Sequence, residues 1–111
     1  MAKIKQIAVR VQVAFIREGK YIVAYAPALE LSSYGKTQIQ AQQAFAGAMK
    51  VFLDETERKG TLERILLKLG WNLAMDKYEP PHYDSKELLG MCRGNSLNEI
   101  KNTTFRIPLP V

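Results

Sequence analysis

The chain has 111 residues, of which 47% are hydrophobic and 24% are charged, a composition typical of one globular domain and not of a disordered or fibrous protein. No run of about 18 apolar residues is present, which excludes a helical membrane span, and the N-terminal segment lacks the apolar stretch of a secretory signal. The single cysteine, Cys92, excludes an internal disulfide. We therefore expect a cytoplasmic protein with no membrane partner.

The net charge of +5 is concentrated in the first third of the chain, because residues 1–36 contain six Lys and Arg side chains against two acids. An excess of this size is compatible with weak attraction to nucleic acid or to an acidic partner. It is equally compatible with an ordinary solvated surface.

Three strands are expected in the N-terminal third. Residues 7–15 alternate along the chain with β-branched residues at most odd positions, and this pattern predicts a half-buried strand whose odd residues face the core. A turn signal at residues 18–20 separates it from a second strand at 21–25, which Pro27 ends. Residues 29–33 are expected to form a short third strand.

The length of the first turn decides which residues share a face of the sheet, because a shift of one residue exchanges the two faces. A two-residue loop places the even residues of 22–26 on the core face, and a three-residue loop reverses this. We prefer the two-residue loop, because alanines suit a face covered by a close-packed helix and tyrosines suit a half-wet face. The opposite face then carries four candidate binding residues: Arg10, Gln12, Tyr21 and Tyr25.

Two helices are expected next. Residues 37–40 have the form of a Thr-x-x-Gln capping box, and apolar side chains follow at three- and four-residue steps, which predicts an amphipathic helix. Gly60 is its expected end, and Thr61 is the expected N-cap of a second helix that ends at Gly70. Residues 71–73 are expected to form a short strand.

The C-terminal third combines irregular and short regular segments. Residues 78–83 contain two prolines and are expected to be irregular. Residues 85–90 and 96–102 are interpreted as short helices, the second because it opens with a Ser-x-x-Glu capping pattern. Residues 104–111 are expected to be an edge strand or a docked tail.

Together these elements predict the α+β class, with a three- to four-stranded antiparallel-type sheet and its helices on one face. Residues 1–75 are expected to form the domain, and residues 76–111 a C-terminal extension that packs on it or follows it. No clear DNA-binding motif is found in the extension, because a helix-turn-helix at 85–102 would need two very short helices in a charge-neutral stretch.

No catalytic constellation can be recognised. His82 is the only histidine, and nothing in the sequence pairs it with Cys92 as a nucleophile. One histidine and one cysteine are too few for a zinc site without carboxylates placed by the fold. The Gly35-Lys36-Thr37 run lacks the upstream glycine of a phosphate loop. We therefore expect a binding protein that is not an enzyme and needs no metal or cofactor.

The remaining candidate site is the sheet surface formed by Arg10, Gln12, Tyr21 and Tyr25. Aromatic side chains beside an arginine on a sheet can stack on nucleic-acid bases or anchor a protein partner. The same face is compatible with self-association into a homodimer, and with an ordinary exposed sheet.

Three motifs resemble the HicB-type antitoxin family. Residues 21–29 are similar to the strand and Pro-x-Leu motif of these proteins, and residues 34–41 to their Gly-x-Thr-x-x-x-Ala helix start. Residues 59–71 resemble the end of a shorter-looped branch, so the likeness covers about residues 7–73. The sequence departs from the family at residues 30–32, where Glu-Leu-Ser stands in place of a Gly-Cys pair, and in lacking a recognised DNA-binding segment.

The resemblance implies a degenerate RNase H-like fold without the nuclease carboxylates, and usually a dimer or a larger oligomer. It also implies that the chain binds and blocks a small HicA-type mRNA-cleaving toxin. We therefore expect an antitoxin-like binding protein that covers the active site of such a toxin. A nucleic-acid-binding module and an orphan homo-oligomeric structural protein without a toxin partner are the alternatives.

Overall fold

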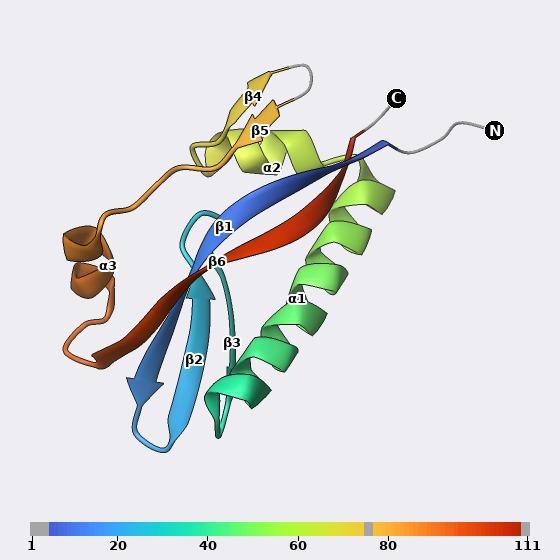
Figure 1. The fold of residues 1–111 in the computed structure, drawn as a ribbon. Coiled ribbons are helices and arrows are strands. Elements are labelled where there is room, and N and C mark those ends of the chain that lie inside the picture. The colour runs from blue at the N-terminus through green and yellow to red at the C-terminus, as the bar shows by residue number, and fades with distance from the viewer. Residues whose placement is uncertain (1–4, 75–76, 110–111) are drawn as a thin grey trace.

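The computed structural model describes residues 5–74 and 77–109, which form an α+β structure around one antiparallel sheet (Figure 1). The sheet has four strands in the order β3-β2-β1-β6, and each strand is antiparallel to its neighbours. Its strands are β1 (Lys5–Glu18), β2 (Tyr21–Ala26), β3 (Leu31–Gly35) and β6 (Ser96–Leu109).

The hairpin of β1 and β2 has the two-residue loop preferred from the sequence. Glu18 lies directly opposite Tyr21, so that Gly19 and Lys20 alone form the turn. Gly19 has a φ of 58°, a left-handed conformation that glycine adopts without steric cost. The predicted division of side chains between the two faces is therefore confirmed, because this register fixes every pair along both strands.

Helix α1 (Gln38–Lys59) begins and ends where the sequence predicts. The hydroxyl oxygen of Thr37 accepts a hydrogen bond from the Gln40 amide at 3.1 Å, and the Gln40 side-chain oxygen accepts one from the Lys36 amide at 3.0 Å. The first bond satisfies a main-chain donor that the first helical turn leaves free, and the second holds the residue before the N-cap, so that Gln40 reaches back to Lys36 and not to the Thr37 amide. Gly60 ends the helix in a left-handed conformation with a φ of 65°.

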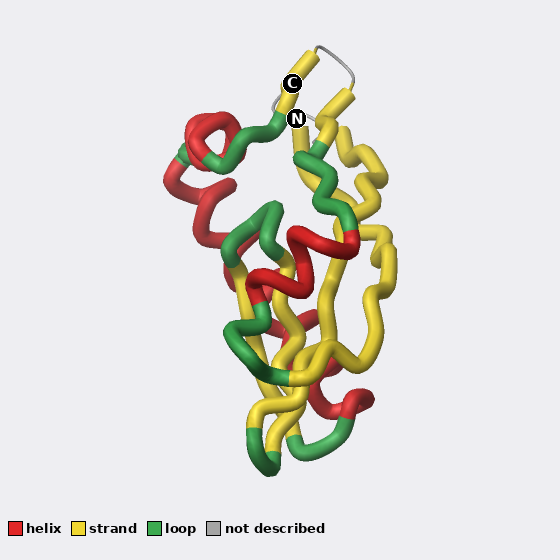
Figure 2. The backbone as a smooth tube through the Cα atoms, turned by 90° about the vertical axis from the view of Figure 1, so that its left-hand side faces the viewer, coloured by secondary structure: helices red, strands yellow, loops and turns green. Residues whose placement is uncertain are grey.

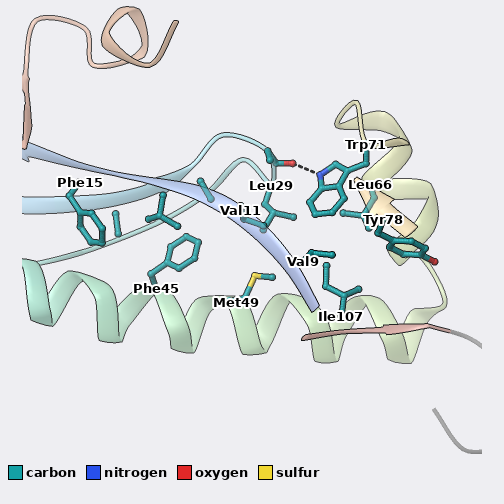
Figure 3. Close-up of a cluster of buried hydrophobic side chains, with 14 of the residues drawn as sticks. Val9, Val11, Phe15, Leu29, Phe45, Met49, Leu66, Trp71, Tyr78 and Ile107 are labelled. Carbon is teal, nitrogen blue, oxygen red and sulfur yellow. Dashed lines mark hydrogen bonds between the residues drawn. The ribbon is translucent and has the colours of Figure 1, made fainter. Parts of the chain in front are cut away.

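The main core lies between α1 and the sheet (Figure 3). The odd residues of β1 and the even residues of β2 point into it. Ala24 and Ala26 are both fully buried, and their small side chains let the helix approach the sheet closely. The buried apolar side chains of this layer include Val9, Val11, Val13, Phe15, Ile22, Leu29, Phe45, Met49 and Ile107.

A second, smaller unit caps one end of the sheet. It contains α2 (Leu62–Lys68) and a hairpin of β4 (Asn72–Ala74) with β5 (Lys77–Glu79). The buried indole N–H of Trp71 donates to the main-chain oxygen of Ala28 at 2.7 Å, which ties this unit to the turn between β2 and β3. Because β5 includes Tyr78, the expectation of irregular backbone is wrong for the first residues of 78–83.

The expectation that all helices cover one face is wrong, because α3 (Ser85–Met91) lies on the opposite side of the sheet from α1 (Figures 1 and 2). Asp84 caps α3: its carboxylate accepts from the Glu87 amide, and the Glu87 carboxylate accepts from the Asp84 amide. Just after α3, the Cys92 side chain packs on Ala14 and Ile16 of β1. The sheet therefore has helical cover on both faces.

The expectation of a helix at residues 96–102 is also wrong, because this segment is the start of β6. The strand pairs with β1 from Ser96 opposite Arg17 to Leu109 opposite Lys5, with one irregularity at Phe15 and Ile16. A long neighbouring strand with free main-chain groups outweighs a local capping pattern, since strand formation depends on tertiary context. The predicted edge strand from residue 104 is confirmed as far as Leu109, and residues 110–111 lie outside the described residues.

A candidate protein-binding surface

The outer face of the sheet, opposite α1, contains all four residues singled out in the sequence. The strand register places Arg10, Gln12, Tyr21 and Tyr25 on this face, together with Val23 and Tyr34. The segment that contains α3 crosses the middle of the face and buries Ala14 and Ile16. The outer face is thereby divided into two open areas at its two ends.

The first open area lies over β2 and β3, near the hairpin turn. Tyr21 and Tyr34 are 44% and 66% exposed, and their rings meet edge to face with centroids 5.5 Å apart and planes at 82°. Val23, directly opposite Tyr34 in the sheet, forms an apolar floor between them. An open hollow of about 560 Å³ is lined by Glu18, Tyr21, Val23, Ser32, Ser33 and Tyr34.

Tyr25 continues this area toward the turn after β2. It is half-buried against the cluster of Ala14, Ile16 and Cys92, and this burial raises the pKa of its hydroxyl. The negative charge of Glu30 adds to the effect, and the positive charge of Arg93 opposes it. Burial also raises the pKa of Tyr83, and both Glu30 and Glu87 add to that effect. The carboxylate of Glu30 therefore lies close enough to act on two tyrosine hydroxyls, and both tyrosines are neutral at physiological pH.

We call this area the tyrosine patch, and define it as Tyr21, Val23, Tyr25 and Tyr34 with the rim carboxylates Glu18 and Glu30. Two of its members, Tyr21 and Tyr25, were predicted from the sequence. Tyr34 was missed, because its position on this face depends on the pairing of Tyr34 with Val23 in β3. The alternation of Ser32 and Tyr34 in a strand would have been the signal, had the bounds of that strand been predicted correctly.

The side chain of Gln12 is hydrogen-bonded to the main chain of Tyr83. Its amide nitrogen donates to the main-chain oxygen of Tyr83 at 2.8 Å, and its amide oxygen accepts from the main-chain nitrogen of Tyr83 at 2.8 Å. A single side chain thus pairs with the backbone as a neighbouring strand would. The structure therefore gives Gln12 a contact that positions the segment before α3.

Arg10 lies in the second open area, at the other end of the face. It lines a hollow of about 220 Å³ with Gln12, Pro80, Pro81, His82 and Asn102. Arg10 is eight positions from Glu18 in β1, roughly 26 Å along an extended strand, and four positions from Ala14, the residue opposite Tyr25, roughly 13 Å. The structure therefore brings Tyr21 and Tyr25 into one surface, whereas Gln12 is bonded to Tyr83 and Arg10 lies further along the same face, beyond Gln12.

The tyrosine patch has the chemistry of a site for cationic side chains. A tyrosine ring attracts Lys and Arg through its negative face, and more strongly when the contact excludes water. The rim carboxylates Glu18 and Glu30 add negative charge beside the rings, with Glu18 accepting a hydrogen bond from Asn95 and with the positive charge of Arg93 near Tyr25. Tyrosine is also enriched among the residues that dominate protein–protein affinity, because it combines a large apolar ring with a polar end.

The two reactive side chains of the C-terminal third lie in different surroundings. Cys92 is buried, its thiol donates to the main-chain oxygen of Leu88 at 3.4 Å, and burial raises its pKa. His82 is exposed in the hollow beside Arg10. Among residues 5–74 and 77–109, no group of three or more His, Cys, Asp or Glu side chains could hold a metal ion. No helix in these same ranges is long and apolar enough to cross a membrane.

Comparison with protein-family models, with curated proteins and with solved structures finds no match for the chain.

Proposed function

We propose that the chain is a HicB-like antitoxin, which binds a small HicA-type mRNA-cleaving toxin and covers its active site. The order of elements supports the proposal: a hairpin, a short third strand, a capped helix and a second helix follow one another. The three motifs that resemble the family fall on β2 and the turn after it (21–29), on the end of β3 with the start of α1 (34–41), and on α2 with its flanking residues (59–71). The tyrosine patch, on the outer face of β2 and β3, is the observation that carries the proposal.

The partner that suits the tyrosine patch is a protein with exposed Lys and Arg side chains. A ribonuclease needs positive charge where it binds the phosphates of its substrate. The same cations can lie over Tyr21 and Tyr34 and beside Glu18 and Glu30. The net charge of the chain is +5, so the attraction must come from this local arrangement and not from the charge of the whole molecule.

Co-expression tests the proposal. The small basic protein encoded beside this gene is induced alone and together with the chain, and growth is followed. We expect growth arrest with the toxin alone, recovery with both, and a stoichiometric complex of the chain with a catalytically inactive toxin on size exclusion. Growth arrest that the chain does not relieve, with no complex, would contradict the proposal.

A second candidate function, nucleic-acid binding, rests on the hollow around Arg10. Arg10 and His82 line the same hollow, and no described carboxylate lies within ion-pair distance of Arg10. Such a site would contact phosphates, and its affinity would fall steeply with salt. Fluorescence anisotropy with labelled RNA and duplex DNA at two salt concentrations checks this, and binding that is absent or insensitive to salt excludes it.

A further inference from the structure

The second open area of the outer face is a small recess with a polar lining. Its hollow of about 220 Å³ is lined by Arg10 and Gln12 of β1, by Asn102 of β6 and by residues 80–82. Pockets that enclose a whole small molecule usually have about 300–1,000 Å³. The hollow is therefore of a size to take one unit of a longer molecule.

The strands β1 and β6 form the floor of the hollow. Gln12 lies opposite Asn102, and Arg10 lies opposite Thr104. Cross-strand partners share a face of the sheet, and so do residues two apart on one strand. The guanidinium of Arg10 and the amide of Asn102 therefore belong to one surface. Arg10 is exposed, and among the described residues no carboxylate lies within ion-pair distance of it.

The wall of the hollow is the loop between β5 and α3, which crosses the outer face (Figure 2). Both main-chain groups of Tyr83 are hydrogen-bonded to the Gln12 side chain at 2.8 Å. Pro80 and Pro81 restrict the loop further, because the proline ring fixes φ. His82 lies directly before Tyr83 and lines the hollow with Arg10. The loop is thus attached to the strand that carries Arg10, two positions from it.

The charges near the hollow have both signs, but its lining contains no acid. Glu30 and Glu87 act on the hydroxyl of Tyr83, and neither of them lines the hollow. Arg106 lies further along β6 and lines the groove beside α1, together with Lys50, Asp54 and Glu57. Among the described residues that line the hollow, Arg10 alone carries a permanent charge. Binding of an anion in the hollow therefore depends on Arg10.

We propose that this hollow binds one nucleotide of a single-stranded nucleic acid, with the phosphate on Arg10 and the base against the rings of His82 and Pro81. The guanidinium fork matches two phosphate oxygens. The imidazole ring is among the aromatic groups on which unstacked bases lie, and the amide of Asn102 offers a donor and an acceptor to the edge of the base. The proposal rests on the second candidate function, nucleic-acid binding, and is independent of the antitoxin proposal.

The shape of the site favours a single strand over a duplex. A duplex keeps its bases stacked, and proteins read it with a helix or a two-stranded ribbon that enters a groove. Here the cation lies on the floor of a recess, beside a proline loop that forms the wall. A nucleotide that projects from a single strand fits such a recess, whereas the convex backbone of a double helix does not.

Fluorescence anisotropy with the purified full chain tests the proposal. The probes are a labelled RNA single strand, the DNA strand of the same sequence and the duplex of that DNA, all at one low salt concentration. We expect a single strand to bind at least about tenfold more tightly than the duplex, a difference of about 1.4 kcal/mol, and the tighter of the two strands identifies the ligand as RNA or DNA. Duplex binding as tight as that of both strands would overturn this inference and leave the second candidate function standing. Absence of binding to every probe would contradict both.

A matched pair of charge substitutions locates the phosphate contact. R10A removes the cation from the hollow, so it should weaken binding of the single strand and lower the slope of log affinity against log salt by about 1. K50A removes one positive charge from the exposed side of α1, which covers the opposite face of the sheet, and should leave the slope unchanged. Equal effects of R10A and K50A would mean that binding follows net charge alone, and the proposal would be wrong.

Substitutions of His82 test the contact with the base. H82A removes the ring and should weaken binding of the single strand about fivefold or more, the usual effect of losing one stacked aromatic side chain. H82F keeps an aromatic ring at the same position and should bind like the wild type. His82 is exposed, so both variants should fold, which circular dichroism checks. Equal affinity of H82A and the wild type would overturn the proposal.

Discussion

The side-chain amide of Gln12 forms two hydrogen bonds to the main chain of Tyr83, each 2.8 Å long, across 71 positions of sequence. This contact holds the segment before α3 against β1, so that α3 starts over the outer face of the sheet. The position of Tyr83 beside Glu30 and Glu87 follows from it. Gln12, which was predicted from the sequence to bind a partner, thus helps to position the segment that packs on the outer face.

Replacing Gln12 by leucine should lower the free energy of unfolding by about 1–3 kcal/mol, because it leaves a partly buried donor and acceptor of Tyr83 without partners. Urea unfolding followed by circular dichroism measures the loss. Arg10→Ala is the matched control on the same strand, since Arg10 is exposed, and should change stability by no more than about 0.5 kcal/mol. Equal effects of the two substitutions would show that the Gln12 contact contributes nothing to stability.

The same substitution, glycine to alanine, should have opposite effects at two positions. At Gly35 an added Cβ would lie 2.6 Å from the main-chain nitrogen of Ala41, so α1 must shift, and we expect a loss of about 1–3 kcal/mol. At Gly47, in the middle of α1, nothing lies within 4 Å of the added atom, and we expect a gain of roughly 0.5–1 kcal/mol. Thermal unfolding of both variants checks the two signs, and a stabilised Gly35→Ala would contradict the close packing of β3 on α1.

Tyr78 should make stability fall at high pH. Burial and the hydrogen bond from its hydroxyl to the Glu63 carboxylate raise its pKa to about 12 from the usual value of 10.0. The contribution of Tyr78 to the free energy of unfolding is complete below 10.0, the pKa of its hydroxyl in the unfolded chain. It is lost as pH rises from 10.0 to about 12, because over this range the unfolded state releases the proton and the folded state keeps it. Urea unfolding at about pH 9 and about pH 11 should show a larger loss of the free energy of unfolding for the wild type than for Tyr78→Phe. Equal losses in the two proteins would contradict the claim that the Tyr78 hydroxyl causes this pH dependence.

Cys92 should react slowly in the folded protein. The thiol is 3% exposed and burial raises its pKa, so both access and the thiolate fraction are low. A disulfide reagent added to the native chain should label it far more slowly than a small-molecule thiol, and the reaction should become fast in urea. Rapid labelling of the native chain would mean that the segment after α3 leaves the sheet readily.

The N-terminal two thirds of the fold could be predicted because their signals are local. The alternation in β1, the glycine in its turn and the Thr37 cap each determine structure within a few residues. The turn length then fixed the faces, which placed Tyr21 and Tyr25 together on the outer face. That inference needed no knowledge of distant contacts.

The C-terminal third could not be predicted because its structure depends on partners far away in sequence. The Ser96 capping pattern is a local helix signal, yet β6 is held as a strand by β1, some 80 positions earlier. The same holds for the candidate site. The hydrogen bonds of Gln12 to Tyr83 and the position of Tyr34 in the patch both arise from contacts between segments that are distant in sequence or paired in the sheet. Nothing in the sequence of β1 indicates that the segment with α3 packs on its outer face.

The central claim is that the tyrosine patch binds and blocks a HicA-type ribonuclease, and the most direct measurement is inhibition of RNA cleavage by the purified chain. Increasing amounts of the chain are added to the toxin, and the cleavage rate is followed. We expect complete inhibition at a stoichiometric ratio, and at least about tenfold weaker inhibition by Y21A/Y34A, since the loss of two aromatic contacts costs more than about 1.4 kcal/mol. The control Val51→Ala, on the far side of the molecule, should inhibit like the wild type. No inhibition by the wild-type chain, or equal inhibition by Y21A/Y34A, would contradict the account.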